Sequence, residues 1–382
     1  MSKKYVSVFS WLLLAAFWGI QLTGCDSAGD GQQEEEPQDK IVAGVNFTRL
    51  FAPPTEAEKQ AVLDDWASRQ PTASGVQIEA DLEIGDHVIL VFSHVVDGNR
   101  HYGAVRIPAN AEGNLPVLMV HHGGDGGVNV AEYAQVLDGA SAAGDFDVSG
   151  GTIQVMPSYR SEPLDLSAYQ QGLVFTSEGE PSPWDRDVDD AIALLNVVLE
   201  QIPQADPDRV AVLGVSRGGG VALLHAIRDV RVNGVVDFFG PTNFFGSMIQ
   251  GLAEYILTGG EPLGLPGEEY LTHRVLFALR DGEISYEEAR LELLKRSPRW
   301  FVEQIPPYVQ IHHGVRDLVV LVEQSDELAQ ALEDAGRTAP EFQYYRYPEG
   351  KHDISTLPGS LERTNNFLDI VYNAAVATKL LF

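Results

Sequence analysis

From residue 115 onward, short apolar runs alternate with helical patterns, and this alternation constrains the fold more than any other feature of the chain. "LPVLMVHH" (115–122), "TIQVMPSY" (152–159) and "VNGVVDFFG" (232–240) lack the polar alternation of a half-exposed strand. Strands that are buried on both faces of a sheet have this pattern, and the intervening helices cover the faces. The sequence therefore predicts an α/β chain whose central sheet is mostly parallel and flanked by helices.

The other elements fit the same architecture. "DGN" between "VILVFSHVV" and "RHYGAVRIP" predicts a hairpin ahead of the parallel strands. Helices are predicted over 54–70 and 183–202, and further strands over 307–314 and 340–350. Residues 241–305 interrupt the alternation with helices, which form either a lid over the site or a unit packed beside it. The lid is favoured because ligands of such sheets bind near the strand ends.

A serine stands between glycines in "LGVSRGGG" (213–220), at the junction of an apolar run and a helical pattern. A serine at such a corner sits in a tight, strained turn, and Gly214 and Gly218 leave room for that turn. The turn lifts the hydroxyl above the sheet edge. Ser216 is therefore the candidate nucleophile of a hydrolase.

A serine nucleophile needs a general base, and the base needs an orienting carboxylate. His352 in "YPEGKHD" follows the last predicted strand in a loop, where catalytic groups concentrate. Asp317 follows the strand over 307–314, and Asp237 at the end of an earlier strand is its rival. The chain order Ser216, Asp317, His352 is that of α/β-hydrolases.

A tetrahedral intermediate also needs hydrogen-bond donors for its oxyanion. The backbone N–H of Arg217 is the first candidate, because it begins the helix after the serine. The second donor is expected from the loop "HHGGDGG" (121–127), where Gly123 and Gly124 let the backbone approach a substrate oxygen.

The first 25 residues are not expected to join a core. Lys3 and Lys4 precede a short apolar run that ends in "LTGC", a pattern typical of an export signal. The ending resembles a bacterial lipobox, which implies lipidation of Cys25; a transmembrane anchor with a chance cysteine is the alternative. We expect a lipoprotein signal over 1–24, an acidic flexible tether over 25–40, and a catalytic domain over 41–382 that is exported and lipid-anchored in the cell envelope.

The net charge of −29 and the single cysteine exclude several functions. Such an acidic surface repels nucleic acid. One thiol forms no internal disulfide and no multi-thiol metal site. The acids of "DRDVDD" (185–190) lack the glycine and final glutamate of a calcium loop and fit a helix N-terminus. No metal and no cofactor is expected.

Taken together, residues 110–380 resemble the catalytic domain of the prolyl oligopeptidase family of serine peptidases. "HHGGDGG" is similar to that family's His/Tyr-Gly-Gly-Pro loop, and "DPDRVAVLGVSRGGGVALL" is similar to its nucleophile stretch. The resemblance implies the α/β-hydrolase fold, the triad Ser216, Asp317 and His352, and an oxyanion position at His122. Asp125 departs from the family's proline, and 40–110 is too short for the propeller that many members carry.

Dienelactone-hydrolase-like esterases resemble the same core and also lack a propeller. Three functions therefore stay open: a serine peptidase, a carboxylesterase on the same triad, and a binding protein without catalysis. The complete triad argues against the third function. A peptide or a small ester is the expected substrate.

Overall fold

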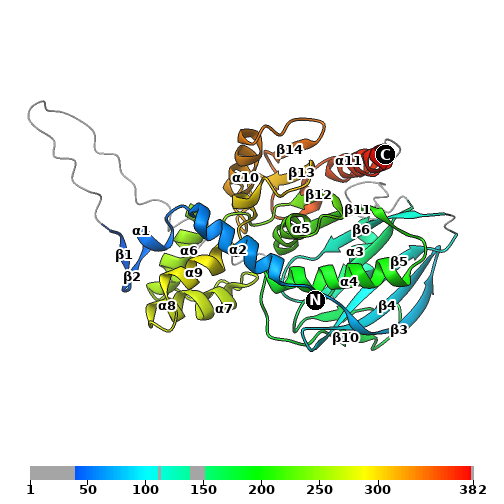
Figure 1. Cartoon of the computed structure of the whole chain (residues 1–382), viewed down its shortest axis with the longest axis horizontal. Coiled ribbons are helices and arrows are strands. Elements are labelled where there is room, and N and C mark those ends of the chain that lie inside the picture. The colour runs from blue at the N-terminus through cyan, green and yellow to red at the C-terminus, as the bar shows by residue number, and fades with distance from the viewer. Residues whose placement is uncertain (1–38, 111–112, 138–150, 380–382) are drawn as a thin grey trace, which may run out of the picture.

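The computed structural model describes residues 39–110, 113–137 and 151–379, and its centre is a twisted nine-stranded sheet (Figure 1). The strands are β3 (Ser74–Ile84), β4 (His87–Val96), β5 (Asn99–Pro108), β6 (Leu115–His121), β8 (Ile153–Pro157), β11 (Ala205–Val215), β12 (Val232–Phe238), β13 (Tyr308–Gly314) and β14 (Phe342–Tyr347). Their order across the sheet is β14-β13-β12-β11-β6-β8-β5-β4-β3. The strands from β14 to β8 run parallel, and β5, β4 and β3 extend the sheet in antiparallel fashion. The predicted mostly parallel sheet is present.

The predicted hairpin joins β4 to β5 through two residues. Val96 pairs with Asn99, so that Asp97 and Gly98 alone form the turn. Both residues have positive φ, 49° for Asp97 and 81° for Gly98, as the tight turns that match strand twist require. Aspartate and glycine tolerate this conformation better than bulky residues do. The sequence signal "DGN" thus has a direct conformational cause.

Helices cover both faces of the sheet, as Figure 1 shows. The longer ones are α2 (Glu56–Ser68), α4 (Arg186–Gln201), α5 (Arg217–Arg228), α6 (Ser247–Leu257), α9 (Tyr286–Leu294), α10 (Glu323–Asp334) and α11 (Ser360–Lys379). Alternate residues of β6 point to opposite faces. Val117 and Met119 pack with α4 and α5, whereas Leu118 and Val120 belong to the cluster that includes α11.

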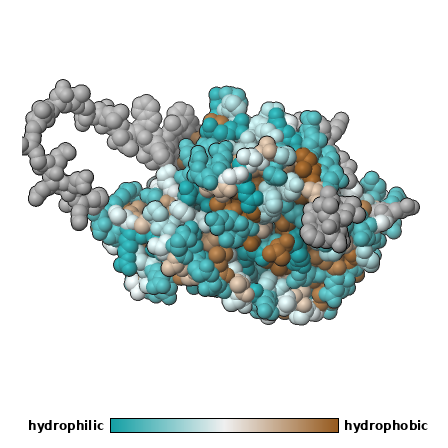
Figure 2. All heavy atoms as spheres, turned by 45° about the horizontal axis from the view of Figure 1, so that its top comes forward, coloured by the Kyte–Doolittle hydropathy of each residue, from teal (hydrophilic) through white to brown (hydrophobic). Residues whose placement is uncertain are grey.

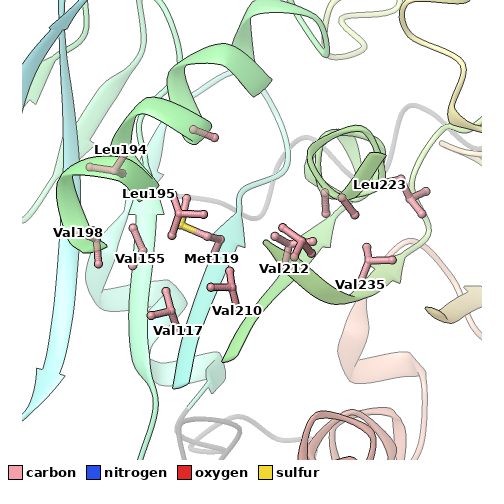
Figure 3. Packing of buried hydrophobic residues seen from close by; sticks show 14 of the residues in the cluster. Val117, Met119, Val155, Leu194, Leu195, Val198, Val210, Val212, Leu223 and Val235 are labelled. Carbon is pink, nitrogen blue, oxygen red and sulfur yellow. The ribbon is translucent and has the colours of Figure 1, made fainter. Parts of the chain in front are cut away.

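The core between the sheet and α4 is closely packed (Figure 3). Leu195 of α4 lies beside Met119 of β6, whereas Leu194 of the same helix packs on Gly103 of β5. Leu223 of α5 lies over Val212 and Val235 on the neighbouring strands. These side chains are fully buried, which explains why the central strands carry uninterrupted apolar runs.

The helical insertion packs on the N-terminal part of the described chain. It contains α6, α7 (Glu268–Tyr270), the π-helix η2 (Leu271–Phe277), α8 (Ala278–Arg280), α9 and η3 (Pro298–Phe301). Arg290 of α9 pairs with Glu58 of α2 and donates to the carbonyl oxygens of Arg49, Leu50 and Ala52. No local sequence pattern predicts this attachment, because it joins residues about 240 positions apart.

The surface in Figure 2 is mostly hydrophilic, with apolar residues gathered in the middle of the face shown. Among the described residues, no helix combines the length and the apolarity needed to cross a bilayer. The predicted signal over 1–24, Cys25 and nearly all of the acidic tether lie outside the described residues. The predictions for that segment therefore stay predictions.

Candidate active site

The strand order creates a switch point at the carboxyl ends of β6 and β11. The chain leaves β6 for β8 on one side, and later returns to β11 on the other side. Connections that diverge in this way leave a crevice, and ligands of open α/β sheets bind there. Ser216 directly follows β11, and the glycine loop of residues 122–127 directly follows β6. Both sequence motifs therefore meet at one edge of the sheet.

Ser216 occupies a strained corner between β11 and α5. Its φ is 57° and its ψ is −125°, a region that L-residues with a side chain rarely adopt. A Cβ on Gly214 would lie 1.9 Å from the carbonyl oxygen of Gly218, and a Cβ on Gly218 would lie 2.1 Å from that of His121. The two glycines are therefore required by the space around the turn, as the sequence predicts.

Ser216, His352 and Asp317 form one continuous hydrogen-bonded chain. The Oγ of Ser216 lies 2.8 Å from Nε2 of His352, and Nδ1 of His352 lies 2.6 Å from Oδ2 of Asp317. A carboxylate only accepts, so Nδ1 carries the proton and Nε2 is free to accept from the serine hydroxyl. The three residues come from the ends of β11, β13 and β14, which lie on one side of the switch point.

Asp317 is held as an ionised acceptor. Its Oδ1 accepts from the backbone N–H groups of Val319 at 2.8 Å and Val320 at 3.0 Å. Burial alone would raise the pKa of Asp317, but hydrogen bonds from His313 and His352 lower it overall. His313, whose Nε2 lies 3.4 Å from Oδ2 of Asp317, is a second histidine beside this carboxylate, and no motif in the sequence pointed to it.

Asp237, the rival acid, lies elsewhere in the site. Its Oδ1 accepts from the N–H of Gly240 at 2.9 Å, and its buried Oδ2 has no hydrogen-bond partner. Burial raises the pKa of Asp237 to about 7. The structure therefore joins Asp317 rather than Asp237 to His352.

The ring of His352 is supported by an aromatic neighbour. Phe239 lies with its ring centroid 4.4 Å from that of His352. Phe239 has a φ of 45°, an uncommon value for a bulky residue, and its N–H donates to the carbonyl oxygen of His312. Strained backbone conformations thus occur at both Ser216 and the residue that packs on its predicted base.

The predicted oxyanion donors have different surroundings. Arg217 is the first residue of α5, so its backbone N–H has no intrahelical acceptor. The N–H of Gly123 donates to the hydroxyl of Tyr133 at 2.9 Å. His122 is buried against the ring of Tyr159, with centroids 4.2 Å apart, and its Nε2 lies 3.4 Å from Oε2 of Glu162. The oxyanion roles of Arg217, His122, Gly123 and Gly124 remain predictions.

The side chain of Arg217 links the nucleophile helix to the glycine loop. Its guanidinium donates to Asp187 at 2.7 Å, to Glu162 at 2.5 Å and to the carbonyl oxygen of Gly124 at 3.1 Å. Burial raises the pKa of Glu162 to about 7, although Arg217 opposes this shift. Asp187 lies in the first turn of α4, as the acidic run "DRDVDD" predicts, and it is buried there as a partner of Arg217.

A largely apolar cavity adjoins Ser216 and Arg217. It encloses about 840 Å³ of empty space, part of it open to solvent. Its walls come from the helical insertion, from Phe51 and Trp184, and from Val319 and Val320 beside Asp317. Within the described residues, no three His, Cys, Asp or Glu side chains cluster as metal ligands.

No protein-family model matches the chain. Dipeptidyl peptidase family member 6 of Caenorhabditis elegans is 29% identical to it over 162 residues, which are 42% of this chain. The matched stretch spans 19% of that relative's length.

Solved structures resemble the chain over a larger part of its length. Acetyl xylan esterase 1 from Thermoanaerobacterium superposes with a TM-score of 0.59 and 17% identity, over 86% of this chain and 99% of that one. A puromycin-hydrolysing peptidase of Mycobacterium tuberculosis superposes with a TM-score of 0.51 and 21% identity, over 76% of this chain and 47% of that one. With the strand order and the serine corner, these likenesses show that the chain has the α/β-hydrolase fold.

Proposed function

We propose that this protein is a serine hydrolase that cleaves an acyl bond through an acyl-enzyme on Ser216. The observation that carries the proposal is the hydrogen-bonded chain from Ser216 through His352 to Asp317 at the strand ends. A serine hydroxyl becomes a useful nucleophile only when a positioned base takes its proton. In this protein Nε2 of His352 is within reach of that proton, and Asp317 fixes the tautomer that accepts it.

The reaction proceeds in two halves. In the first half, Ser216 Oγ attacks the carbonyl carbon while His352 takes the hydroxyl proton, and His352 then donates that proton to the departing alcohol or amine. In the second half, His352 takes a proton from water, the resulting hydroxide attacks the acyl-enzyme, and Ser216 leaves with its proton restored. Asp317 stays ionised throughout and stabilises the imidazolium.

The oxyanion of each tetrahedral intermediate lies at the start of α5. The N–H of Arg217 has no intrahelical acceptor because Arg217 begins α5, and the helix dipole favours the negative charge. The second donor comes from the loop after β6, which Arg217 fixes through the carbonyl oxygen of Gly124. Gly124 has a φ of 72°, so this part of the loop adopts a conformation that favours glycine.

For the scissile bond, we propose a peptide bond first and a carboxylic ester as the second candidate. The prolyl-oligopeptidase-like motifs and the partial likeness to a dipeptidyl peptidase family member favour the peptidase. The likeness to acetyl xylan esterase 1 over 99% of that enzyme's length favours the esterase, because that structure resembles nearly the whole described chain. An amide demands a more exacting geometry than an ester, since its leaving nitrogen must be protonated.

A fluorophosphonate probe tests the shared chemistry. We expect it to label wild-type protein at Ser216 and to leave Ser216→Ala unlabelled. Ser216→Ala should lower kcat by about 10⁴–10⁶-fold. Comparing kcat/KM on short acyl esters and on peptidyl arylamides then decides between the two bonds: turnover of esters alone makes the protein an esterase. Absence of labelling and of turnover would leave a binding protein without catalysis.

We also propose that the protein is exported and anchored through a lipid on Cys25. The positive start, the apolar run and "LTGC" support this proposal. Cys25→Ser should move the protein from the membrane pellet to a soluble or signal-bound form. Wild-type protein that is soluble in the cytoplasm with Lys3 and Lys4 still attached would contradict the proposal.

A further inference from the structure

The cavity beside Ser216 has walls that suit an apolar group. Helix α6 contributes five of the lining residues, namely Met248, Ile249, Leu252, Ala253 and Ile256. The π-helix η2 contributes Leu271, Thr272 and Leu276. Such π-helical turns occur often at functional sites. Burying apolar surface here is the main favourable contribution that the cavity can offer a ligand.

The two charged residues in the cavity wall are already satisfied. The carboxylate of Glu268 accepts from the backbone N–H groups of Leu263 at 2.9 Å and Leu265 at 3.0 Å. The guanidinium of Arg217 is occupied by Asp187, Glu162 and Gly124. A negatively charged group that entered the cavity would lose hydration without gaining a free cationic partner, which is costly. The apolar walls therefore favour an uncharged group.

The floor of the cavity is held in place before any ligand binds. Trp184 is buried and has a φ of 63°. Its backbone N–H donates to Asp187 at 2.9 Å, and its indole N–H donates to the carbonyl oxygen of Arg217 at 3.1 Å. A strained residue that persists in this way is over-determined by its surroundings. A rigid floor next to the nucleophile lowers the cost of ordering a bound group.

The position of the cavity identifies which part of a substrate it takes. The leaving group must lie beside His352, because His352 protonates it. The cavity wall includes Ser216 and Arg217, but it includes neither His352 nor its neighbours in the loop after β14. A group inside the cavity is therefore joined to the carbonyl carbon that Ser216 attacks.

We propose that this cavity binds an uncharged apolar acyl group longer than acetyl, which stays on Ser216 in the acyl-enzyme. The inference rests on the proposed serine hydrolase activity. A fatty acyl chain of an ester and a bulky apolar side chain next to a peptide bond present the same chemistry to these walls. Each buried CH₂ group is worth up to about fourfold in binding.

The test is an acyl-length series with one leaving group. We expect kcat/KM for p-nitrophenyl hexanoate to exceed that for the acetate by at least about tenfold, since four more CH₂ groups are buried. Peptidyl arylamides with leucine or phenylalanine next to the bond should likewise exceed those with lysine or glutamate. These two arms distinguish the ester source of the acyl group from the peptide source.

Variants of α6 locate the effect. Leu252 lines the cavity and is only partly buried, so the helix should tolerate a change there. Leu252→Trp should lower the hexanoate-to-acetate ratio by about tenfold, and Leu252→Ala should move the preference to longer chains. Tyr255→Trp is the matched control, because Tyr255 is on the same helix, is 37% exposed and does not line the cavity. It should leave the ratio and the activity unchanged.

The outcomes separate this inference from the proposed activity. If the acetate is hydrolysed as fast as the hexanoate and charged arylamides as fast as apolar ones, the cavity inference is wrong while the serine hydrolase stands. An unchanged chain-length ratio in both Leu252 variants would also overturn it. If no substrate turns over and no fluorophosphonate labels Ser216, the proposed activity itself fails.

Discussion

Arg217 Nη2 lies 2.7 Å from Oδ2 of Asp187, fully inside the protein, one residue after the candidate nucleophile. The same guanidinium reaches Glu162 and the carbonyl oxygen of Gly124. Asp187 lies in the first turn of α4. The side chain of Arg217 therefore connects the nucleophile helix α5, the helix α4 and the glycine loop. We therefore predict that the side chain of Arg217 positions the site, in addition to the predicted role of its backbone N–H as an oxyanion donor.

Arg217→Met should weaken both stability and turnover. The backbone N–H remains, but Asp187 and Glu162 are left buried without their cation, which should lower the free energy of unfolding by about 3–5 kcal/mol. Release of the glycine loop should lower kcat by about 10²-fold, with a smaller effect on KM. Urea unfolding and steady-state kinetics measure the two effects, and Arg217→Lys should restore part of the stability.

Arg280→Met is the control for the loss of an arginine ion pair. Arg280 pairs with Asp281 and both side chains are exposed, so its removal should change stability little and leave kcat unchanged. Equal effects of the two arginine variants would refute the positioning role of Arg217.

The identity of the acid is tested by two matched amides. Asp317→Asn should lower kcat by about 10⁴-fold, because an amide favours the wrong tautomer of His352. Asp237→Asn should leave kcat within a fewfold of the wild type, since Asp237 bonds to Gly240 rather than to His352. Steady-state kinetics on an activated ester measures both. If kcat fell strongly in Asp237→Asn and only slightly in Asp317→Asn, Asp237 would be the acid instead of Asp317.

Asp237 should also make stability depend on pH. Its pKa is raised to about 7 in the folded protein, against about 3.9 in an unfolded chain. The folded state thus binds the proton of Asp237 more tightly than the unfolded chain does. The free energy of unfolding therefore falls as the pH rises from about 4 to about 7, where Asp237 would ionise in the unfolded chain but not in the folded protein. Asp237→Asn should not show this loss. The free energy of unfolding of the variant, relative to that of the wild type, should therefore rise by about 2–4 kcal/mol from pH 4 to pH 8.

Urea unfolding at several pH values measures this slope. Asp317→Asn should change the pH dependence of stability in the opposite direction. The pKa of Asp317 is lowered in the folded protein, so this carboxyl stabilises the wild type at neutral pH and loses that effect as the pH falls. A difference between wild type and Asp237→Asn that is the same at every pH would show that Asp237 does not titrate in this range.

The serine corner should not accept a methyl group. Gly214→Ala places a Cβ 1.9 Å from the carbonyl oxygen of Gly218, so the backbone must move at the cost of about 3 kcal/mol and most of the activity. Gly251→Ala on α6 is the control, because a Cβ there meets nothing within 4 Å. It should raise the melting temperature slightly, since alanine favours helix over glycine. Thermal unfolding and esterase assays of both variants decide the matter, and full activity in Gly214→Ala would contradict the strained-corner geometry.

Local pattern was enough to predict much of this protein. The central strands are recognisable because burial on both faces requires apolar runs, and the β4–β5 turn because "DGN" suits a positive φ. The tight turn at Ser216 was predictable because it leaves no space for side chains at Gly214 and Gly218, so that the sequence must carry glycine at both positions. His352 and Asp317 were found because both follow strands whose carboxyl ends meet at one edge.

Only the tertiary structure decided how these parts combine. That Asp317 rather than Asp237 reaches His352 depends on the side-by-side order of β12, β13 and β14. The burial of Asp187 against Arg217 and the cavity between Phe51, α6 and η2 join segments far apart in the chain. A local pattern reports the period and conformation of one segment, because those depend on neighbouring residues. The partner of a buried charge and the shape of a cavity depend on which distant surfaces the fold brings into contact, and no single segment encodes that.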